Sequence, residues 1–424
     1  MLGQRYLDDG KPVVYLNDQQ IEAKRRIENK GYPIENYECE CGATEEAFEV
    51  LAEKDRYGLK SRTVICRKCG LVMTNPRMTQ EAYDDYYNTE YAKLYRNQLI
   101  PDEEYFEERI ERGKVIYDYI VGEVGNKFNT VLEIGCAAGA ILYYFKQQGC
   151  EVTGVDLGKD YIEFGKKKGL NLYQCHSSEL LREKKKYDLI IVNHVAEHFL
   201  NIGNELNVIQ QLLDKDGILY IEVPGIKNLV NSYEGDFLKY LQNAHVYDFT
   251  LGTLEQIMKK YGFELVVGDE VVHSVWKYTG KREQIIKNYF YDNLSFLAQL
   301  EGARVEREKN IFAKLKENLQ YLIIDITGYV NELKETKNMN TSWLKQILSR
   351  LNETLQIIDL VIAQINEEKT VIDEETVNQN IDVLNNAIME CNIERLQDSL
   401  DRMKDMLQMI EKTMVNSGEC TNEI

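Results

Sequence analysis

Two glycines and two acids in the middle of the chain have the types and spacing of a nucleoside-binding turn. Glu133, Gly135 and Gly139 lie at the end of a short apolar run, and Asp156 ends the next one. Glycine lets the backbone turn tightly and leaves room for a ligand where a Cβ would collide. A carboxylate at the tip of the second strand can accept both hydroxyls of a ribose. The pattern therefore predicts a site for a nucleoside-shaped cofactor.

The acid ahead of the first glycine separates this turn from a dinucleotide-binding turn. A dinucleotide fold has three glycines spaced G-x-G-x-x-G and holds a pyrophosphate at the helix N-terminus. Here two glycines stand four residues apart, and Glu133 would repel a phosphate. A carboxylate suits the ammonium group of a nucleoside that carries an amino acid. The turn resembles the cofactor loop of class I S-adenosylmethionine (SAM)-dependent methyltransferases, and the resemblance extends from about residue 130 to residue 278.

This resemblance implies SAM as the cofactor and a set of residues that bind it along the turn and the following strand ends. The set is Glu133, Gly135, Cys136, Gly139, Asp156, Leu157, Ser177 and Asn193. Ser177 is included because the segment after the third expected strand occupies the place where this fold contacts the adenine edge. Another nucleotide-binding α/β domain is the alternative that the pattern leaves open.

A second polar cluster follows the fourth expected strand. Asn193, His194, Glu197 and His198 come directly after the apolar run at 187–192. Ligands in open parallel sheets bind beyond the carboxyl ends of the strands. We therefore expect these side chains near the transferred methyl group. The structural alternative is that Glu197 and His198 cap and pack the next helix.

A further histidine, His245, lies in a loop ahead of a helix expected at 251–261. The same arrangement recurs in SAM enzymes that act on small molecules, especially sugars. A histidine over the substrate is a candidate base because its pKa lies near neutrality. We expect His245, His198 and Glu197 to be the catalytic residues, with one of the two histidines removing or orienting the acceptor's proton.

Four of the nine cysteines come in two close pairs, each followed by glycine. Cys39 and Cys41 form the first pair, and Cys66 and Cys69 follow about 24 residues later. Four thiolates can converge tetrahedrally on Zn²⁺, and each glycine permits the tight knuckle. The spacing predicts a zinc ribbon with a structural role, since four cysteine ligands leave no open position. The first pair is one residue shorter than usual, and two pairs of buried thiols are the alternative.

A helix dense in tyrosine is expected after the ribbon. Aromatic stripes at helical spacing are usually core. Phenol groups, however, can both stack and hydrogen-bond. In enzymes that resemble this chain the helix lies over the cofactor and sugar pocket. The resemblance implies that Tyr83, Tyr87 and Tyr91 contact the substrate.

The net charge and the distribution of apolar residues and cysteines exclude some classes of partner and cellular location. The formal net charge is −19, so a nucleic acid would be repelled and is not expected as a partner. The sequence has no run of about 18 apolar residues and no signal-peptide pattern, which predicts a soluble, cytoplasmic protein without membrane insertion. The other five cysteines are scattered, which favours reduced thiols over a disulfide framework.

A length of 424 residues predicts two or three domains. We expect a lead-in and zinc ribbon at 1–78, a SAM-dependent methyltransferase domain at 79–280, and a helical bundle or coiled coil at 281–424. In the last segment apolar residues alternate three- and four-residue steps, as in Ile393, Leu396, Leu400, Met403, Leu407, Ile410 and Met414. This heptad pattern predicts homo-oligomerisation or docking to a partner through the C-terminal helices.

The predicted fold class is α/β: a Rossmann-like, seven-stranded SAM methyltransferase domain with a small N-terminal zinc ribbon and an all-α C-terminal module. This combination resembles sugar methyltransferases with an N-terminal zinc ribbon, among them C-methyltransferases that act on nucleotide-linked keto-sugars. It implies a sugar hydroxyl or carbon as the acceptor.

Two departures from that family weigh against C-methylation. The family's loop has an acid just before the histidine and a tyrosine shortly upstream, where this chain has Ala244 and Gln242. The family also continues into a second α/β domain, where this chain changes to a helical pattern. The alternatives in other classes are a catalytically silent methyltransferase-fold scaffold that works through its helical module, and a protein or RNA methyltransferase.

Overall fold

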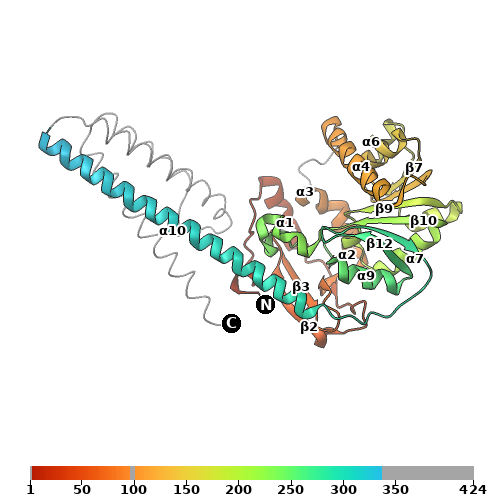
Figure 1. Cartoon of the computed structure of the whole chain (residues 1–424), viewed down its shortest axis with the longest axis horizontal. Coiled ribbons are helices and arrows are strands. Elements are labelled where there is room, and N and C mark those ends of the chain that lie inside the picture. Colours follow the sequence, from red (N-terminus) through yellow and green to blue (C-terminus); the bar gives the residue numbers. More distant parts are fainter. Residues whose placement is uncertain (1, 96–100, 337–424) are drawn as a thin grey trace. The chain divides into compact units, whose positions relative to one another are not determined.

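The computed structural model describes residues 2–95 and 101–336 (Figure 1). The chain divides into two compact units, one made of residues 1–10 and 16–300 and the other of residues 11–15 and 301–424. Helix α10 (Phe290–Thr336) begins the expected helical segment. The predicted heptads between 337 and 424 lie outside the described residues.

A seven-stranded sheet forms the centre of the first unit, as the sequence predicted. Its order is β12-β13-β10-β9-β6-β7-β8. The five strands from β10 to β8 run parallel, while β13 runs antiparallel to both β10 and β12. The strands are β6 (Thr130–Ile134), β7 (Glu151–Asp156), β8 (Leu172–Gln174), β9 (Tyr187–Asn193), β10 (Leu213–Glu222), β12 (Phe263–Gly268) and β13 (His273–Tyr278).

Helices cover both faces of this sheet because its central strands are apolar on both sides. Along β9, Ile190 and Val192 pack toward one face, while Leu189 and Ile191 pack toward the other. The first face carries α7 (Ile202–Leu212) and α9 (Leu251–Lys260). The second carries α4 (Glu103–Val124), α5 (Ala140–Gln147) and α6 (Lys159–Lys167) (Figure 1). A short helix, α8 (Phe237–Tyr240), lies in the long loop after β10.

The N-terminal region contributes one helix and two small sheets. Helix α1 (Asp18–Lys30) begins at a capping box formed by Asn17 and Gln20. Strands β1 (Ile34–Glu35) and β5 (Arg77–Met78) pair with each other. A four-stranded sheet has the order β11-β4-β3-β2, with β2 (Phe48–Lys54), β3 (Lys60–Cys66), β4 (Val72–Thr74) and β11 (Tyr247–Asp248). Since β11 comes from the loop after β10, this sheet ties the cysteine region to the larger domain.

The tyrosine-rich segment is helical but irregular. Helix α2 (Gln80–Tyr86) passes into a π-helical turn (Tyr87–Tyr91) and then into α3 (Ala92–Tyr95). A π-helical turn is rare and occurs frequently at functional sites. The widened turn lies where the sequence predicted substrate contacts.

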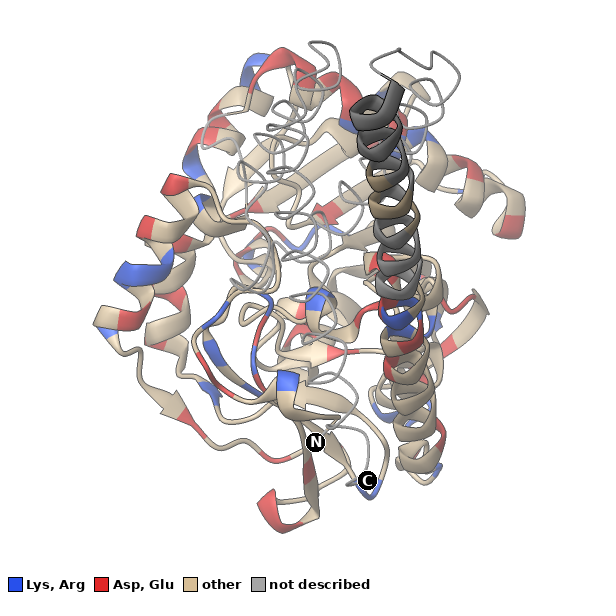
Figure 2. Cartoon of the chain, turned by 90° about the vertical axis from the view of Figure 1, so that its left-hand side faces the viewer, with Lys and Arg blue, Asp and Glu red and all other residues tan. Residues whose placement is uncertain are grey.

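The surface is charged and mixed. Figure 2 shows acidic and basic residues interspersed along the helices. Among residues 2–95 and 101–336, no helix is both long and apolar enough to cross a bilayer.

Candidate functional site

The turn between β6 and α5 depends on glycine. Gly135 and Gly139 both have a φ of 73°, a left-handed conformation that other residues adopt only with strain. The amide groups of Gly135 and Cys136 both donate to the carbonyl of Val155, at 2.8 and 3.0 Å. A Cβ on Gly135 would lie 2.3 Å from Cγ2 of Val195. The turn is therefore closely packed against the loop that follows β9.

The Asp156 carboxylate is fixed over this turn. Its Oδ2 accepts the Ala137 amide at 2.9 Å, and its Oδ1 accepts the Gly158 amide at 2.7 Å. An ionised carboxylate has about four acceptor positions, so each oxygen retains one for a further donor. The group is thus fixed in position with acceptor capacity left for further donors.

A buried acid lies below the turn. Glu133 is 2 % exposed, and among the described residues its Oε2 has no hydrogen-bond partner. Burial, reinforced by the nearby Asp156, raises the pKa of the Glu133 carboxyl well above its ordinary value. Buried polar atoms are rarely left without a partner. A donor group from a ligand would satisfy this one, so the residues fit an amino-acid-bearing nucleoside.

The other predicted cofactor residues lie in different environments. Leu157, directly after Asp156, is 40 % exposed and offers an apolar surface. Cys136 is buried, and burial raises the pKa of its thiol well above the ordinary value. The hydroxyl of Ser177 donates to Glu205 on α7 at 3.0 Å, so it is already engaged. The buried Oδ1 of Asn193 has no partner within the described part of the chain.

Two predicted catalytic histidines meet beyond the strand ends. The rings of His198 and His245 lie 4.9 Å apart and nearly perpendicular. Nδ1 of His198 is 2.9 Å from the carbonyl of Ala244. A carbonyl only accepts, so this geometry assigns the proton to Nδ1 and leaves Nε2 free to accept one. Burial lowers the pKa of His198 to about 4, so the ring is neutral at pH 7.

The third predicted catalytic residue, Glu197, lies beside this pair. Its Oε1 is 3.8 Å from Nε2 of His198 and 3.6 Å from Nδ1 of His194. Burial alone would raise the pKa of this carboxyl, but the contacts with His194 and the neighbouring rings outweigh burial and lower it. Its Oε2 is buried and has no partner in the described residues. The structure thus brings Glu197, His198 and His245 together, with an ionised carboxylate beside two imidazoles.

The loop that carries His245 is held from several sides. Nδ1 of His245 lies 3.6 Å from Oδ1 of Asp248, and the histidine is 4 % exposed. The hydroxyl of Thr74 donates to the carbonyl of His245 at 2.8 Å. The amide of Val246 donates to the carbonyl of Glu197 at 2.8 Å. The position of this histidine is therefore fixed by both the N-terminal sheet and the loop after β9.

The predicted tyrosines border the histidine pair. Tyr87 and Tyr91 are stacked at 4.4 Å with an interplanar angle of 16°. Both rings meet His198 edge-on, at 6.0 and 5.9 Å. Tyr83 is buried, and its hydroxyl lies 2.7 Å from the carbonyl of Ala244 and 2.9 Å from that of His198. Tyr83 therefore holds the loops, while the two stacked rings cover His198.

A further ionic cluster was not predicted from the sequence. Glu222 ends β10, and its Oε1 lies 3.3 Å from Nε2 of His194 and 3.5 Å from Nε2 of His273. Arg112 of α4 forms an ion pair with the same oxygen. Burial would raise the pKa of Glu222, but the contacts with His194, His273 and Arg112 hold it well below its ordinary value. An acid that closes a buried strand was a usable signal for Glu222; no local pattern marked His273 or Arg112.

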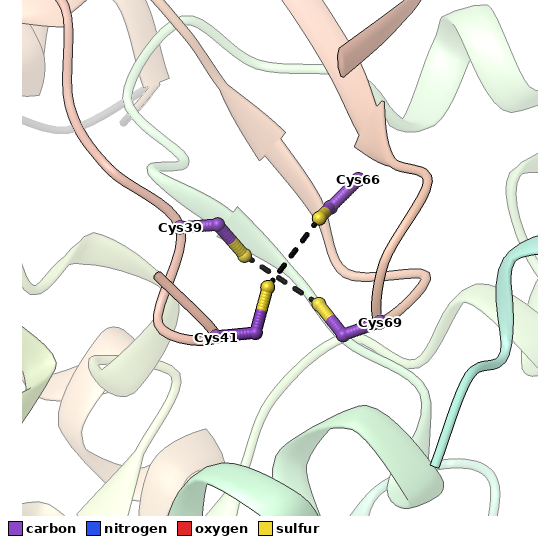
Figure 3. Close-up of side chains that lie close together, drawn as sticks. All are labelled: Cys39, Cys41, Cys66 and Cys69. Atoms are coloured by element: carbon purple, nitrogen blue, oxygen red, sulfur yellow. Dashed lines mark hydrogen bonds between the residues drawn. The ribbon is translucent and has the colours of Figure 1, made fainter. Parts of the chain in front are cut away.

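The four paired cysteines converge on one point (Figure 3). Sγ of Cys39 lies 3.5 Å from Sγ of Cys69, and Sγ of Cys41 lies 3.6 Å from Sγ of Cys66. All four are free thiols, with their sulfur atoms within 4.8 Å of one another. Tetrahedral zinc with Zn–S bonds of about 2.3 Å requires sulfur separations of about 3.8 Å. The donor set and its spacing fit such an ion.

Both cysteine pairs end in a glycine knuckle. Gly42 has a φ of 76° and donates its amide to Cys39, and Gly70 has a φ of 80° and donates to Cys66. The shorter first pair therefore also ends in a left-handed glycine whose amide returns to the first cysteine, over three residues instead of four. The intervening Glu40 is buried and accepts from Lys260 at 2.7 Å, which fastens the first knuckle to α9.

Part of the chain is similar to known methyltransferases. Residues 84–267 match a family model described as "Methyltransferase domain". Over 96 residues the chain is 34% identical to a ubiquinone biosynthesis O-methyltransferase of Pelagibacter ubique, a match that covers 22% of this chain and 40% of that protein. Over 235 residues it is 23% identical to the C-methyltransferase NovU of Streptomyces niveus, covering 53% of this chain and 52% of that protein. The chain thus spans about half of the length of these relatives, or less.

A solved structure of the Burkholderia thailandensis 1,6-didemethyltoxoflavin-N1-methyltransferase, with bound 1,6-didemethyltoxoflavin and S-adenosylhomocysteine, aligns with 18% identity and a TM-score of 0.36. The alignment covers 50% of this chain and 96% of that chain. The family match covers β6 to β10, together with the glycine turn and the strand-end residues described above. Residues 84–267 are therefore similar to a methyltransferase domain.

Proposed function

We propose that this protein is a SAM-dependent methyltransferase that acts on a small-molecule acceptor, a sugar hydroxyl or carbon in nucleotide-linked or glycan form. One relationship carries the proposal. A glycine turn with the fixed Asp156 carboxylate lies at the strand ends, and the buried Glu197–His198–His245 cluster lies beyond a neighbouring strand. Close packing of Val195 against Gly135 joins the two parts. A nucleoside site and an acid–base site are thus adjacent.

The cofactor residues divide the work of binding. Asp156 has acceptor positions for the ribose, and the unpartnered Glu133 oxygen can take a donor from the amino-acid end of the cofactor. Leu157 offers an exposed apolar side chain for the adenine. When bound, SAM supplies an electrophilic methyl group.

The acid–base residues act on the acceptor. A hydroxyl is a weak nucleophile, so a positioned base that takes its proton accelerates transfer. His198 has its free Nε2 beside the ionised Glu197, which stabilises the imidazolium that forms. His245 lies against the same ring and orients it, or itself takes the proton. The stacked Tyr87 and Tyr91 provide an aromatic wall for a sugar ring.

We also propose that Cys39, Cys41, Cys66 and Cys69 hold a structural Zn²⁺. The converging free thiols, the two glycine knuckles and the sulfur separations support this. The ion would fix β2, β3 and β4, and through β11 it would support the loop that carries His245.

Calorimetry with S-adenosylhomocysteine tests the cofactor site. Asp156→Ala removes the ribose acceptor, whereas Asp160→Ala removes an exposed acid in the first turn of α6 and serves as the matched control. We expect wild type and Asp160→Ala to bind alike and Asp156→Ala to bind at least about tenfold more weakly, since hydrogen bonds to a charged group contribute about 1.5–3 kcal/mol. Absence of binding by the wild-type protein would remove the enzymatic proposal.

A transfer assay tests the acceptor. SAM with a labelled methyl group would be offered with nucleotide-linked hexoses, oligosaccharides, protein and RNA in separate reactions. Label in the hexose or oligosaccharide fraction supports a sugar acceptor. Label in protein or RNA alone would replace the sugar proposal with a macromolecular acceptor.

A further inference from the structure

Four of the five histidines of the chain lie in one continuous array with two buried glutamates. The array consists of His245, His198, Glu197, His194, Glu222 and His273. Imidazoles and carboxylates mostly alternate along it, so the groups that exchange protons near neutral pH stand next to one another. Only part of the array is needed to form a catalytic base.

Glu197 joins the inner part of the array to His194. Its Oε1 is 3.8 Å from Nε2 of His198 and 3.6 Å from Nδ1 of His194. The other nitrogen of His194 faces Glu222 at 3.3 Å. The ring of His194 therefore bridges the two carboxylates through its two nitrogens.

The array runs from the interior to the surface. The side chains of His245 and His198 are 4 % and 13 % exposed, whereas that of His194 is 48 % exposed. Beyond Glu222, Nδ1 of His273 contacts the half-exposed Asp269 at 3.0 Å. The array thus places titratable groups one after another from the buried inner pair to a half-exposed imidazole.

The backbone at His194 is strained in a way that sets this bridge. Its φ is 54°, a left-handed value that is uncommon outside glycine and that asparagine, aspartate and histidine adopt most often among the other residues. The amide of His194 donates to the carbonyl of Glu222 at 2.8 Å. Strain of this kind persists where the surrounding structure holds it, and it is concentrated at functional sites. The turn directs the ring between Glu197 and Glu222.

Resting on the proposed function, we infer that this array is a proton-transfer chain and that His194 is its exit residue, passing to solvent the proton that the acceptor loses. Methyl transfer forms a bond between the acceptor atom and the methyl carbon and breaks the carbon–sulfur bond, whose electron pair returns to sulfur. The acceptor's proton goes to an imidazole of the His198–His245 pair. One proton then leaves His194 for each that enters, so the array begins every turnover in the same charge state.

The inference holds for either acceptor chemistry. A hydroxyl and an acidic carbon each release one proton when they are methylated. Both would need the same exit, since His198 is covered by the stacked tyrosines and contacts Ala244, and His245 is buried.

The charges around His194 define its resting state. Glu197 comes from the loop after β9, Glu222 from β10, His273 from β13 and Arg112 from α4, and the buried His198 lies behind Glu197. Burial lowers the pKa of His194, but the two glutamates outweigh it and raise the pKa to about 9. His194 thus holds a proton at neutral pH and keeps Glu197 ionised beside the base.

The first test needs no acceptor. The imidazole nitrogens of ¹⁵N-histidine-labelled protein would be titrated by NMR with S-adenosylhomocysteine present, with assignments from single histidine variants. We expect Glu222→Gln to lower the pKa of His194 by about one unit or more, as loss of a close opposite charge does. The control Lys277→Gln, at a half-exposed residue of β13, should leave it unchanged. If His194 titrates identically in wild type and Glu222→Gln, the rings are not coupled and the chain does not exist.

The second test uses turnover with the nucleotide-linked hexose that is methylated fastest. His194→Gly and His194→Asn both tolerate the left-handed backbone, so they separate loss of the ring from misfolding. We expect both to bind S-adenosylhomocysteine like wild type and to turn over at least about tenfold more slowly, the lower range of acid–base effects. Free imidazole should restore turnover in the glycine variant, where it has both space and access to water, and not in the asparagine variant.

The outcomes separate the two proposals. Normal binding with wild-type turnover in both variants, or no rescue by imidazole, overturns the exit role and leaves the proposed function intact. Failure of the wild-type protein to bind S-adenosylhomocysteine overturns the proposed function itself.

Discussion

The hydroxyl of Thr74 donates to the carbonyl of His245 at 2.8 Å, although 171 residues separate them in the sequence. Thr74 ends β4, a strand of the sheet that carries the cysteine cluster. The backbone amide of Thr74 donates to the carbonyl of Val246 at 3.0 Å. Two bonds therefore fix the backbone of a predicted catalytic histidine to the N-terminal sheet.

Thr74→Val should reduce turnover without reducing affinity for S-adenosylhomocysteine. Valine keeps the shape but leaves the buried carbonyl of His245 without its donor, a cost of about 1–3 kcal/mol that the loop relieves by moving. Thr63→Val, at the cross-strand neighbour of Thr74, is the control for a threonine lost from this sheet. Calorimetry and labelled methyl transfer measure the two effects. Equal turnover in the three proteins would show that this hydrogen bond does not position the histidine.

Removal of the proposed zinc should lower both the thermal stability of the protein and its rate of methyl transfer. Cys66→Ser weakens a four-thiolate site, so we expect a lower thermal midpoint and loss of bound zinc by elemental analysis. Since β11 is part of the same sheet, methyl transfer should fall as well. Cys150→Ser changes a partly buried thiol outside the cluster and should do neither. Stoichiometric zinc and unchanged melting in Cys66→Ser would contradict a four-cysteine site.

The parts of the fold that could be predicted are those with local signals. Glycine spacing, an acid at a strand tip and continuous apolar runs gave the strands around Asp156 and the position of the glycine turn. The two cysteine pairs, each ending in Cys-Gly, predicted the cysteine cluster. A tight turn at each glycine lets the two thiols of a pair face the same point. Each of these signals can be identified from residues close together in the sequence.

The rest depended on contacts between distant segments. The sharing of β11 by the cysteine-containing sheet could not be predicted, since Tyr247 and Asp248 form a strand of two residues with no periodicity. The Glu222–His273 contact joins antiparallel strands whose order no local pattern specifies. The hydrogen bond from Ser177 to Glu205 likewise forms between segments that only the tertiary fold brings together. Contacts between side chains on different elements could not be predicted, because they depend on how the elements pack.

Gly135→Ala should weaken cofactor binding, and it should do so more through steric contact than through backbone strain. A Cβ there meets Cγ2 of Val195 at 2.3 Å, and the φ of 73° adds about 1–2 kcal/mol of strain for alanine. Gly149→Ala has a comparable φ of 91° with no atom within 4 Å, so it isolates the strain. We expect affinity for S-adenosylhomocysteine to fall at least about tenfold in the first variant and to be kept in the second. Similar affinities in the two would show that the turn can move away from Val195.

The unfolding free energy should fall in mild acid because of His198. Its folded pKa of about 4 lies below the ordinary 6.5, so protonation favours the unfolded chain. The resulting stability is full above pH 6.5 and is lost as pH falls toward 4. Asp55 acts oppositely, since burial raises its pKa to about 6 and protonation favours its folded form.

Comparing the wild type with His198→Asn cancels the contribution of Asp55. Urea unfolding at pH 7 and pH 5 should show a loss about 2 kcal/mol larger in the wild type, as calculated from the two pKa values of His198. Equal losses in the two proteins would mean that His198 accepts a proton as readily in the folded protein as in water. Such a ring would be exposed to solvent, and the neutral base beside Glu197 would have to be sought at His245.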